Sequence, residues 1–238
     1  MSEKRRIALL DEIRGFCIYC MVFYHAFYLL GTLLQLNFCT RLFRFFEPAE
    51  LVFASAFIFI SGVCTQFSRS VMRRGLLLLG VALTLSAVTI LLLPRLGYDA
   101  FQDRFGILHL LSCSMLVCAA GQKFFEKIPV LWGSAACILL YTAAAILVPR
   151  LHVRVSWLFP LGLINDTFYS ADYFPILPHL FVFLLGMFAG RTIRARELPE
   201  KVYRVRVHLF AFCGRYSLWI YLLHVPILLL IIQMIERI

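Results

Sequence analysis

Histidine side chains inside apolar stretches are the first candidates for chemistry in this sequence. Four of the six histidines, His25, His109, His179 and His224, lie within long runs of hydrophobic residues. A titratable side chain costs free energy in apolar surroundings, so such a residue is a functional candidate by default. A neutral imidazole can accept a proton as a general base or attack an electrophile as a nucleophile. We therefore predict these four histidines to be catalytic, with a hydrogen-bonded packing role as the alternative.

Arg14 and His25 are predicted to lie on the same face of one helix. They are eleven residues apart, which at about 100° per residue is close to a whole number of turns. The rise between them is roughly 16 Å, and Asp11 lies one turn before Arg14, where the two can pair. A cation at the helix end and a deep imidazole suit a long substrate with an anionic head and a reactive tip. The alternative is a membrane-surface arginine and a packing histidine.

A second polar stripe lies near the end of the chain. Ser217, Tyr221 and His224 follow the i, i+4, i+7 spacing that places side chains on one face of a helix. His25 and His224 are expected near mid-depth of the membrane, and the other two histidines one or two turns from the outer ends of their helices. If these faces meet in one cavity, they line a path across the membrane. This convergence is a hypothesis.

Charged and aromatic residues at the ends of the apolar runs are the candidates for binding. Arg73 and Arg74 are predicted to be membrane-surface charges that are also well placed for a phosphate. Glu50 is either solvated or holds a cationic acceptor. Asp172 and Tyr173 belong to the longest outer connection, and a connection of this length is often functional. A plain connecting loop is the alternative for that segment.

Seven apolar segments must position these residues, and the composition is that of a membrane protein. Of the 238 residues, 62% are hydrophobic and 15% are charged, whereas a soluble domain has about half apolar and a quarter charged residues. The runs approach the ~20 residues needed to cross ~30 Å of hydrocarbon. We predict an all-α polytopic transmembrane bundle of about seven spans, forming a single domain over residues 1–238. The predicted spans are residues 14–36, 49–67, 75–93, 105–121, 130–148, 173–190 and 215–235, of which the fourth is short.

The distribution of lysine and arginine predicts how the bundle is oriented. The formal net charge is +10, but the basic residues cluster between the apolar runs, which argues against nucleic-acid binding. With the N-terminus in the cytoplasm, sixteen basic residues fall inside and seven outside, in agreement with the positive-inside rule. The C-terminus is then predicted outside. The first span lacks a signal-peptide cleavage pattern and is expected to remain in the mature protein.

The eight cysteines give no strong sign of a metal or redox centre. Cys17 and Cys20 have CxxC spacing, but they lie on an apolar stretch and no second pair accompanies them. Buried cysteine behaves as a small hydrophobic residue. We therefore predict a packing role for this pair and no metal site.

Six short motifs are spread along nearly the whole chain. They are Leu10–Gly15 followed by His25, Phe59–Gly62, Phe105–His109, Asp172–Pro175, Phe183–Gly186 and Gly214–Pro226. The first motif resembles the opening signature of the acyltransferase-3 superfamily of membrane enzymes. The others resemble the catalytic domain of the heparan-alpha-glucosaminide N-acetyltransferase family in its short bacterial form, within this wider acyltransferase-3-like group. The resemblance implies a bacterial inner-membrane enzyme that moves an acetyl group from cytoplasmic acetyl-CoA to an acceptor on the other side, a sugar amine or hydroxyl. In the acyltransferase-3 relatives the first-helix histidine is catalytic and the arginine lies near CoA, which implies these roles for His25 and Arg14.

The enzyme hypothesis gives the remaining residues roles around this transfer. Arg73 and Arg74 would help Arg14 to hold the phosphates of CoA, while His25, assisted by His224, would act as base or nucleophile. The predicted acceptor-binding residues are Asp172, Tyr173, Glu50 and Tyr221. The expected partners are the lipid bilayer, acetyl-CoA, a glycan or other small acceptor, and a second copy of the chain.

Two other classes of function stay open on the sequence alone. A small-solute or proton-coupled transporter would also use buried histidines, as a proton relay, although the chain shows no duplicated halves of the kind many transporters have. A non-catalytic membrane scaffold would use them only for packing.

Overall fold

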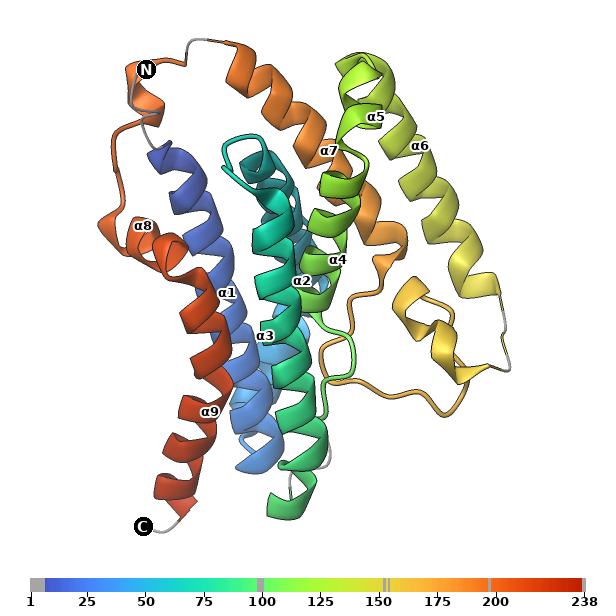
Figure 1. Cartoon of the computed structure of the whole chain (residues 1–238). Helices are drawn as coiled ribbons and strands as arrows, with labels where there is room; N and C mark the ends of the chain where they lie inside the picture. Colours follow the sequence, from blue (N-terminus) through green and yellow to red (C-terminus); the bar gives the residue numbers. More distant parts are fainter. Residues whose placement is uncertain (1–6, 98–100, 152, 154, 197, 237–238) are drawn as a thin grey trace. The chain divides into compact units, whose positions relative to one another are not determined.

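The fold is built from α-helices, and the connection between residues 147 and 176 is much longer than most of the others (Figure 1). The computed structural model of the protein describes residues 7–97, 101–151, 153, 155–196 and 198–236, and within these residues the only β pairing is an isolated bridge between Phe105 and Tyr173. The α-helices are α1 (Ala8–Leu33), α2 (Asn37–Thr65), α3 (Val71–Leu91), α4 (Ile107–Ala120), α5 (Gln122–Lys127), α6 (Val130–Leu147), α7 (Ile176–Ala195), α8 (His208–Arg215) and α9 (Ser217–Glu236). Short 3-10 helices cover Pro94–Leu96, Val148–Arg150, Ser156–Leu161 and Glu200–Val202.

Helix length and composition confirm the predicted fold class. Among the described residues, six helices are long and apolar enough to cross a membrane: α1, α2, α3, α6, α7 and α9. The chain is therefore an integral multi-pass membrane protein. The fourth predicted span corresponds to α4, which has 14 residues and a length of about 21 Å at ~1.5 Å per residue, less than the ~30 Å hydrocarbon core. The orientation of the termini stays a prediction.

The chain divides into two compact units. The first unit contains residues 1–60 and 198–238, and the second contains residues 61–197. The first unit thus joins the two ends of the sequence, with α1, most of α2, α8 and α9, and the second holds α3 to α7. A single functional domain over the whole chain stays a prediction.

Two glycines let α8 lie directly on α1 in the first unit. A Cβ atom added to Gly15 would collide with the backbone carbonyl oxygen of Phe210 on α8. One added to Gly214 would collide with the carbonyl oxygen of Asp11 on α1. Because each glycine faces the backbone of the opposite helix, any side chain at either position would push the two helices apart.

Glu12 on α1 holds the N-terminal end of α8. Its side chain is 7% exposed, and its Oε1 accepts hydrogen bonds from the backbone N–H groups of Arg206 at 2.5 Å and Val207 at 3.5 Å. The free N–H groups at a helix N-terminus carry partial positive charge, so a buried carboxylate is favourable there. The sequence predicted only a basic loop in this region. The structure instead has the eight-residue helix α8 there, because contacts from α1 hold it in place.

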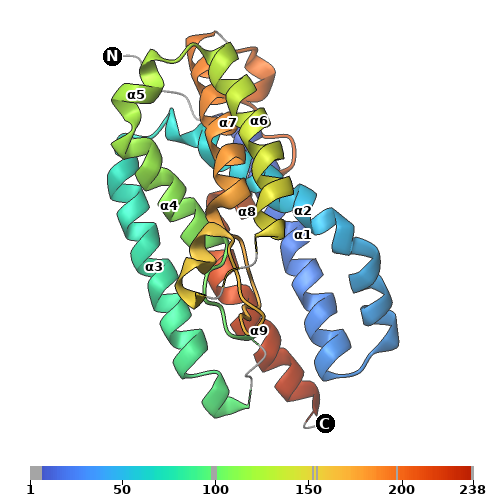
Figure 2. The same ribbon diagram turned by 90° about the vertical axis from the view of Figure 1, so that its right-hand side faces the viewer.

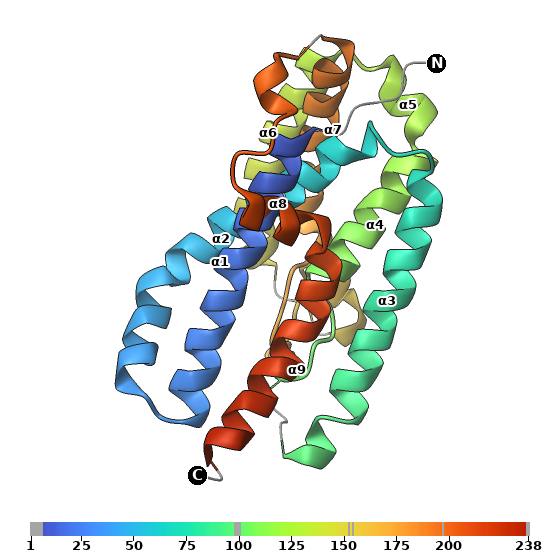
Figure 3. The same cartoon turned by 90° about the vertical axis from the view of Figure 1, so that its left-hand side faces the viewer.

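Aromatic side chains fill the space between α1 and the first part of α2, which run as an antiparallel hairpin (Figure 2). Phe16 packs edge-on against Phe53, with 5.8 Å between ring centroids. Tyr24 lies 4.8 Å from Phe43 by the same measure. On its other side α1 lies beside α9 (Figure 3), so α1 connects the aromatic hairpin to the C-terminal helix.

In the second unit α3 lies beside α4 and α6 beside α7 (Figure 2). Glycine residues also allow the end of α2 to contact α7. A Cβ atom on Gly190 of α7 would lie 2.7 Å from the carbonyl oxygen of Val63. One on Gly62 would collide with the carbonyl oxygen of Phe183. The last turn of α2 and the middle of α7 are therefore in backbone contact, as small residues permit between membrane helices.

Two loops of the second unit are joined by backbone hydrogen bonds. The Phe105–Tyr173 bridge is flanked by a bond from the N–H of Phe174 to the carbonyl of Phe105 at 3.0 Å. A further bond of 2.8 Å runs from the N–H of Ala171 to the carbonyl of Gln102. This pairing fixes the segment that leads into α4 against the segment that leads into α7, and it therefore positions side chains at the start of both helices.

Candidate active site

His25 and His224 are in direct contact in the first unit. Nδ1 of His25 on α1 lies 3.1 Å from Nε2 of His224 on α9, and the ring centroids are 5.0 Å apart. His224 is 7% exposed, whereas His25 is partly exposed. The sequence placed both residues near mid-depth of their helices, and the side-by-side packing of α1 and α9 brings the two rings together.

The hydrogen bonds define which nitrogen of each ring carries a proton. Nδ1 of His224 lies 2.6 Å from the backbone carbonyl oxygen of Tyr221. A carbonyl oxygen only accepts, so this Nδ1 must donate, and in the neutral ring Nε2 is then an acceptor. Nδ1 of His25 therefore donates to His224, and Nε2 of His25 keeps its lone pair. A histidine held in this form can act as a base or as a nucleophile through Nε2.

Tyr24, the residue before His25 on α1, is bonded to Glu50 of α2. The hydroxyl of Tyr24 is hydrogen-bonded to the carboxylate of Glu50, and the Tyr24 ring is 5.7 Å from the His25 ring by centroids. Glu50 was predicted as an acceptor-binding residue. Tyr24 was not predicted, because a tyrosine in an apolar run is usually a packing residue. Tyr24 therefore links the Glu50 carboxylate to the His25 imidazole: its hydroxyl bonds to Glu50 and its ring lies beside that of His25.

Arg14 lies on α1 toward the N-terminal end of the same helix. Its guanidinium is 3.7 Å from the carboxylate of Asp11, one turn away, as the spacing predicted. Because α1 is one continuous helix from Ala8 to Leu33, Arg14 and His25 are separated along the axis by roughly 16 Å. The predicted separation of Arg14 and His25 along one helix is therefore present, while the depth of each residue in the membrane stays a prediction.

His109 lies in the second unit among polar groups that the sequence did not connect. Its Nε2 is 3.4 Å from the hydroxyl of Ser86 on α3, and the residue is 3% exposed. Oδ2 of Asp172 accepts a hydrogen bond from the N–H of Ile107 at the start of α4, at 3.4 Å. Asp103, which was not singled out in the sequence, is buried next to Asp172, and burial together with the charge of Asp172 raises the pKa of Asp103 to about 8.

The other predicted residues of the second unit have more ordinary surroundings. Nδ1 of His179 lies 3.1 Å from the carbonyl oxygen of Pro175. The hydroxyl of Tyr173 donates to the carbonyl of Phe159 at 2.6 Å, and burial raises the pKa of Tyr173 to about 12. Arg73 and Arg74 are exposed on the first turn of α3.

The predicted residues thus form two groups. The first unit holds His25, His224, Tyr221, Glu50 and Arg14, and the second holds His109, His179, Asp172, Tyr173, Arg73 and Arg74. A common passage lined by both groups stays a prediction. Among the described residues, no group of three or more His, Cys, Asp or Glu side chains could hold a metal ion, and the absence of a metal likewise stays a prediction.

A family model described as "Heparan-alpha-glucosaminide N-acetyltransferase, catalytic" matches residues 6–226, which includes every residue of the two groups. No curated protein and no solved structure matches the chain.

Proposed function

The chain belongs to the heparan-alpha-glucosaminide N-acetyltransferase catalytic family, and from this premise we propose that it transfers acetyl groups from cytoplasmic acetyl-CoA to an acceptor on the opposite side of the membrane. The family implies an acetyltransferase, and the six apolar helices embed it in a membrane. The proposed acceptor is a sugar amine or hydroxyl. Acetyl-CoA would be the donor, as is general in this family.

The contact between His25 and His224 is the observation that supports this proposal most directly. It leaves Nε2 of His25 unprotonated, and each of the two proposed routes uses such a nitrogen. In one route Nε2 takes the proton of the acceptor as the acceptor attacks the thioester carbon, and the proton later passes to the departing thiolate. In the other route Nε2 attacks the thioester carbon, and the C–S bond breaks to release the CoA thiolate. The acceptor then attacks the acetyl group, the bond from Nε2 to the acetyl carbon breaks, and the proton of the acceptor passes to the thiolate.

His224 would act on His25 rather than on the substrate. In both routes Nε2 of His25 gains a bond and the ring gains positive charge. The Nδ1–H of His25 then becomes a stronger donor to His224. Because the carbonyl of Tyr221 fixes Nδ1 of His224 as a donor, Nε2 of His224 remains an acceptor throughout. His224 is therefore proposed as a positioning residue.

The binding roles are assigned by charge. Arg14 in the first unit, and Arg73 and Arg74 in the second, are proposed to hold phosphates of CoA. Glu50 is proposed to meet the acceptor near His25, and Tyr221 to bind it from α9. Asp172 and Tyr173 are proposed as acceptor-binding residues of the second unit, with His109 and His179 as further catalytic candidates there.

The test is acetyl transfer by purified protein with radiolabelled acetyl-CoA, using glucosamine as an amine acceptor and glucose as a hydroxyl acceptor. We expect His25→Ala to lower kcat by about 10²–10⁴-fold, the usual contribution of an acid–base residue. His208→Ala is the matched control, because His208 is exposed at the start of α8 and should change nothing. Equal rates for His25→Ala and the wild type would refute the role of His25.

The two routes differ in whether the protein itself becomes acetylated. If His25 is a nucleophile, incubation with labelled acetyl-CoA and no acceptor should leave label on the wild type and none on His25→Ala. If His25 is a base, neither protein should retain label. The acceptor-dependent transfer rate of His25→Ala should still be lower than that of the wild type.

A further inference from the structure

The short helix α8 lies at the ends of two membrane-spanning helices of the first unit. Gly214 of α8 meets the backbone of Asp11 in the first turn of α1, and α9 begins at Ser217, one residue beyond the end of α8. Both α1 and α9 are long and apolar enough to cross a membrane. Figures 1 and 3 show α8 running across the long axes of these two helices. A helix that crosses the ends of two spans lies along the membrane surface rather than through the membrane.

One face of α8 is occupied by α1. Cys213 and Gly214 are buried on this face. The ring of Phe210 packs against the rings of Phe16 and Tyr19 on α1, with 5.3 Å and 5.7 Å between ring centroids. These contacts determine which side of α8 faces the protein, and they therefore also determine which side faces outward.

The outward side of α8 is apolar. Leu209 is 53% exposed, Phe212 is 58% exposed, and Tyr216, directly after the helix, is 43% exposed. Their spacing of three and four residues places these side chains next to one another, and the rings of Phe212 and Tyr216 are 4.9 Å apart by centroids. A surface helix of a soluble protein turns polar residues outward. An outward apolar face, here Leu209, Phe212 and Tyr216, is typical of a helix that lies in the membrane interface.

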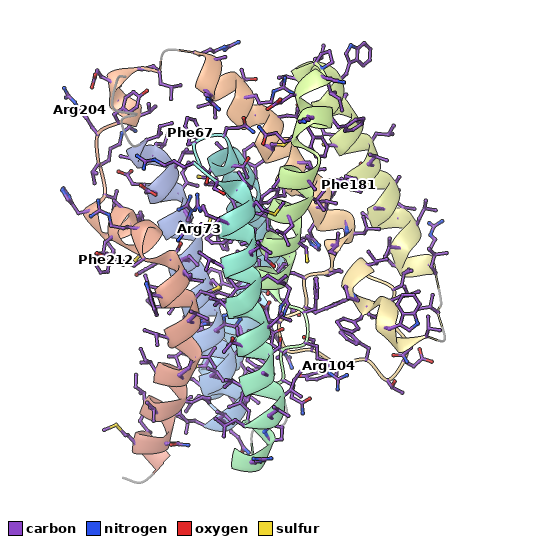
Figure 4. All side chains as sticks on the ribbon, in the orientation of Figure 1. Phe67, Arg73, Arg104, Phe181, Arg204 and Phe212 are labelled. Atoms are coloured by element: carbon purple, nitrogen blue, oxygen red, sulfur yellow. The ribbon has the colours of Figure 1, made fainter. Side chains whose placement is uncertain are left out.

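Basic side chains border this apolar face. Lys201, Arg204, Arg206 and Arg215 are all exposed, and we call these four residues the basic border. Arg215 follows Phe212 by three residues and therefore lies beside it on the helix. Figure 4 shows Arg204 and Phe212 at the outer edge of this unit. Cationic and apolar side chains are thus presented together on the same surface.

The acidic residues around α8 leave this positive charge in excess. Between residues 198 and 216 the sequence contains one acidic residue, Glu200. From α1, the carboxylate of Glu12 is buried and is bonded to backbone N–H groups at the start of α8. The carboxylate of Asp11 pairs with Arg14. The four cations of the basic border therefore face a single exposed acid in their own segment.

We propose that α8 is a membrane-surface helix that binds anionic phospholipid. The apolar face would lie at the boundary between headgroups and acyl chains, and the basic border would contact the negatively charged headgroups. An apolar face alone would suit any lipid or another protein, but the basic border favours a partner with negative charge. An anionic lipid presents this charge directly beside its apolar chains, as the surface of α8 requires.

Bound lipid would also hold α8 on α1. A ligand that binds only one state of a protein stabilises that state, and the apolar face and the basic border are placed together only while α8 is docked. The lipid and the buried Glu12 would therefore act on the same helix from opposite sides.

Quenching by brominated lipids measures which lipid contacts α8. The reporter is Phe212→Trp in a chain whose three natural tryptophans are replaced by phenylalanine, reconstituted in phosphatidylcholine bilayers. A small fraction of the lipid is then exchanged for brominated phosphatidylglycerol, which is anionic, or for brominated phosphatidylcholine, which has no net charge. We expect the anionic lipid to bind beside the indole about fivefold more strongly, the factor that corresponds to ~1 kcal/mol for one basic side chain near the lipid surface.

Substitution of the arginines separates the effect of charge from that of the apolar face. Glutamine at all three arginines of the basic border should bring the ratio of the two binding constants to about one, while both lipids still quench. The matched control removes the same charge from three exposed arginines of the second unit and should leave the ratio unchanged; it combines Arg95→Gln, Arg104→Gln and Arg150→Gln.

Two results of the quenching assay would overturn the proposal. Equal quenching by the two lipids would mean that α8 contacts lipid without regard to its charge. Quenching by neither lipid would mean that protein, such as a second copy of the chain, covers the apolar face.

Wild-type protein provides a measurement that does not depend on whether any variant folds. Native mass spectrometry of protein equilibrated with equal amounts of the two unbrominated lipids should show phosphatidylglycerol retained in excess, and equal retention would refute the proposal. Neither assay contains acetyl-CoA, so both outcomes are independent of the proposed acetyl transfer.

Discussion

Glu12 is the residue whose removal should loosen α8 without unfolding the rest of the chain. Glu12→Ala removes the acceptor of two backbone N–H groups at the start of α8. Loss of a helix cap costs about 0.5–2 kcal/mol, and a buried N–H left without an acceptor costs about 1–3 kcal/mol. A cost of about 2 kcal/mol corresponds to a roughly 30-fold rise in the population with α8 detached. Glu12→Gln keeps a neutral acceptor, so about 1 kcal/mol and roughly a fivefold rise are expected.

Cys213 reports this opening because it lies on α8 and is buried. Burial also raises the pKa of its thiol, so the reactive thiolate forms mainly when α8 detaches. The assay is alkylation in detergent micelles, followed for each cysteine peptide by mass spectrometry. When closing is fast, the alkylation rate follows the open population. Cys118 on α4 is also buried and is the internal control.

Two results would contradict this reasoning. If Cys213 reacted at the wild-type rate in Glu12→Ala, the carboxylate would not be holding α8. If Cys118 accelerated as much as Cys213, the substitution would have destabilised the whole fold rather than one helix.

Three features of the fold can each be tested by a single substitution. Tyr24→Phe removes the hydroxyl bonded to Glu50. In steady-state transfer assays we expect KM for the acceptor to rise about tenfold with kcat nearly unchanged. An unchanged KM would argue against acceptor binding at Glu50. Gly62→Ala should destabilise the protein by about 1–3 kcal/mol in thermal unfolding, whereas Gly80→Ala, where an added Cβ meets nothing within 4 Å, should be neutral or stabilising. Because the pKa of Asp103 is raised from 3.8 to about 8, the folded chain keeps a proton that the unfolded chain releases. Stability should therefore fall as pH rises from about 4 to about 8 and then level off, and Asp103→Asn should flatten this dependence.

The membrane spans could be predicted from the sequence because each depends on its own residues. Apolar runs long enough to cross a bilayer are a local property, and six of them became spanning helices. Helix periodicity likewise predicted the pairing of Arg14 with Asp11. In contrast, α8 has only eight residues and depends on Glu12 from the other end of the chain. No pattern within residues 208–215 indicates that contact.

The neighbours of the candidate residues could be predicted only in part. The polar stripe on α9 indicated which side of His224 is polar, and the enzyme hypothesis made His224 an assistant of His25, but no local pattern predicted the direct contact of the two rings. Asp103 was missed because its carboxylate becomes unusual only through the nearby carboxylate of Asp172. The backbone pairing of two loops that are far apart in the sequence brings these two residues together. Tyr24 was missed because its aromatic ring suits an apolar helix equally well, with or without a bond to Glu50.

The contacts along α1 also restrict how the sequence can change in length. Gly15 and Gly214 mark where α1 meets α8, and His25 and His224 mark where α1 meets α9. Each histidine follows its glycine by the same interval of ten residues. Deletion of one residue within either interval would shift one imidazole by about 1.5 Å and rotate it by about 100° relative to the other. Single insertions and deletions should therefore be excluded from both intervals, while the connection between residues 198 and 205, which ends before the contacts with Glu12, can vary in length.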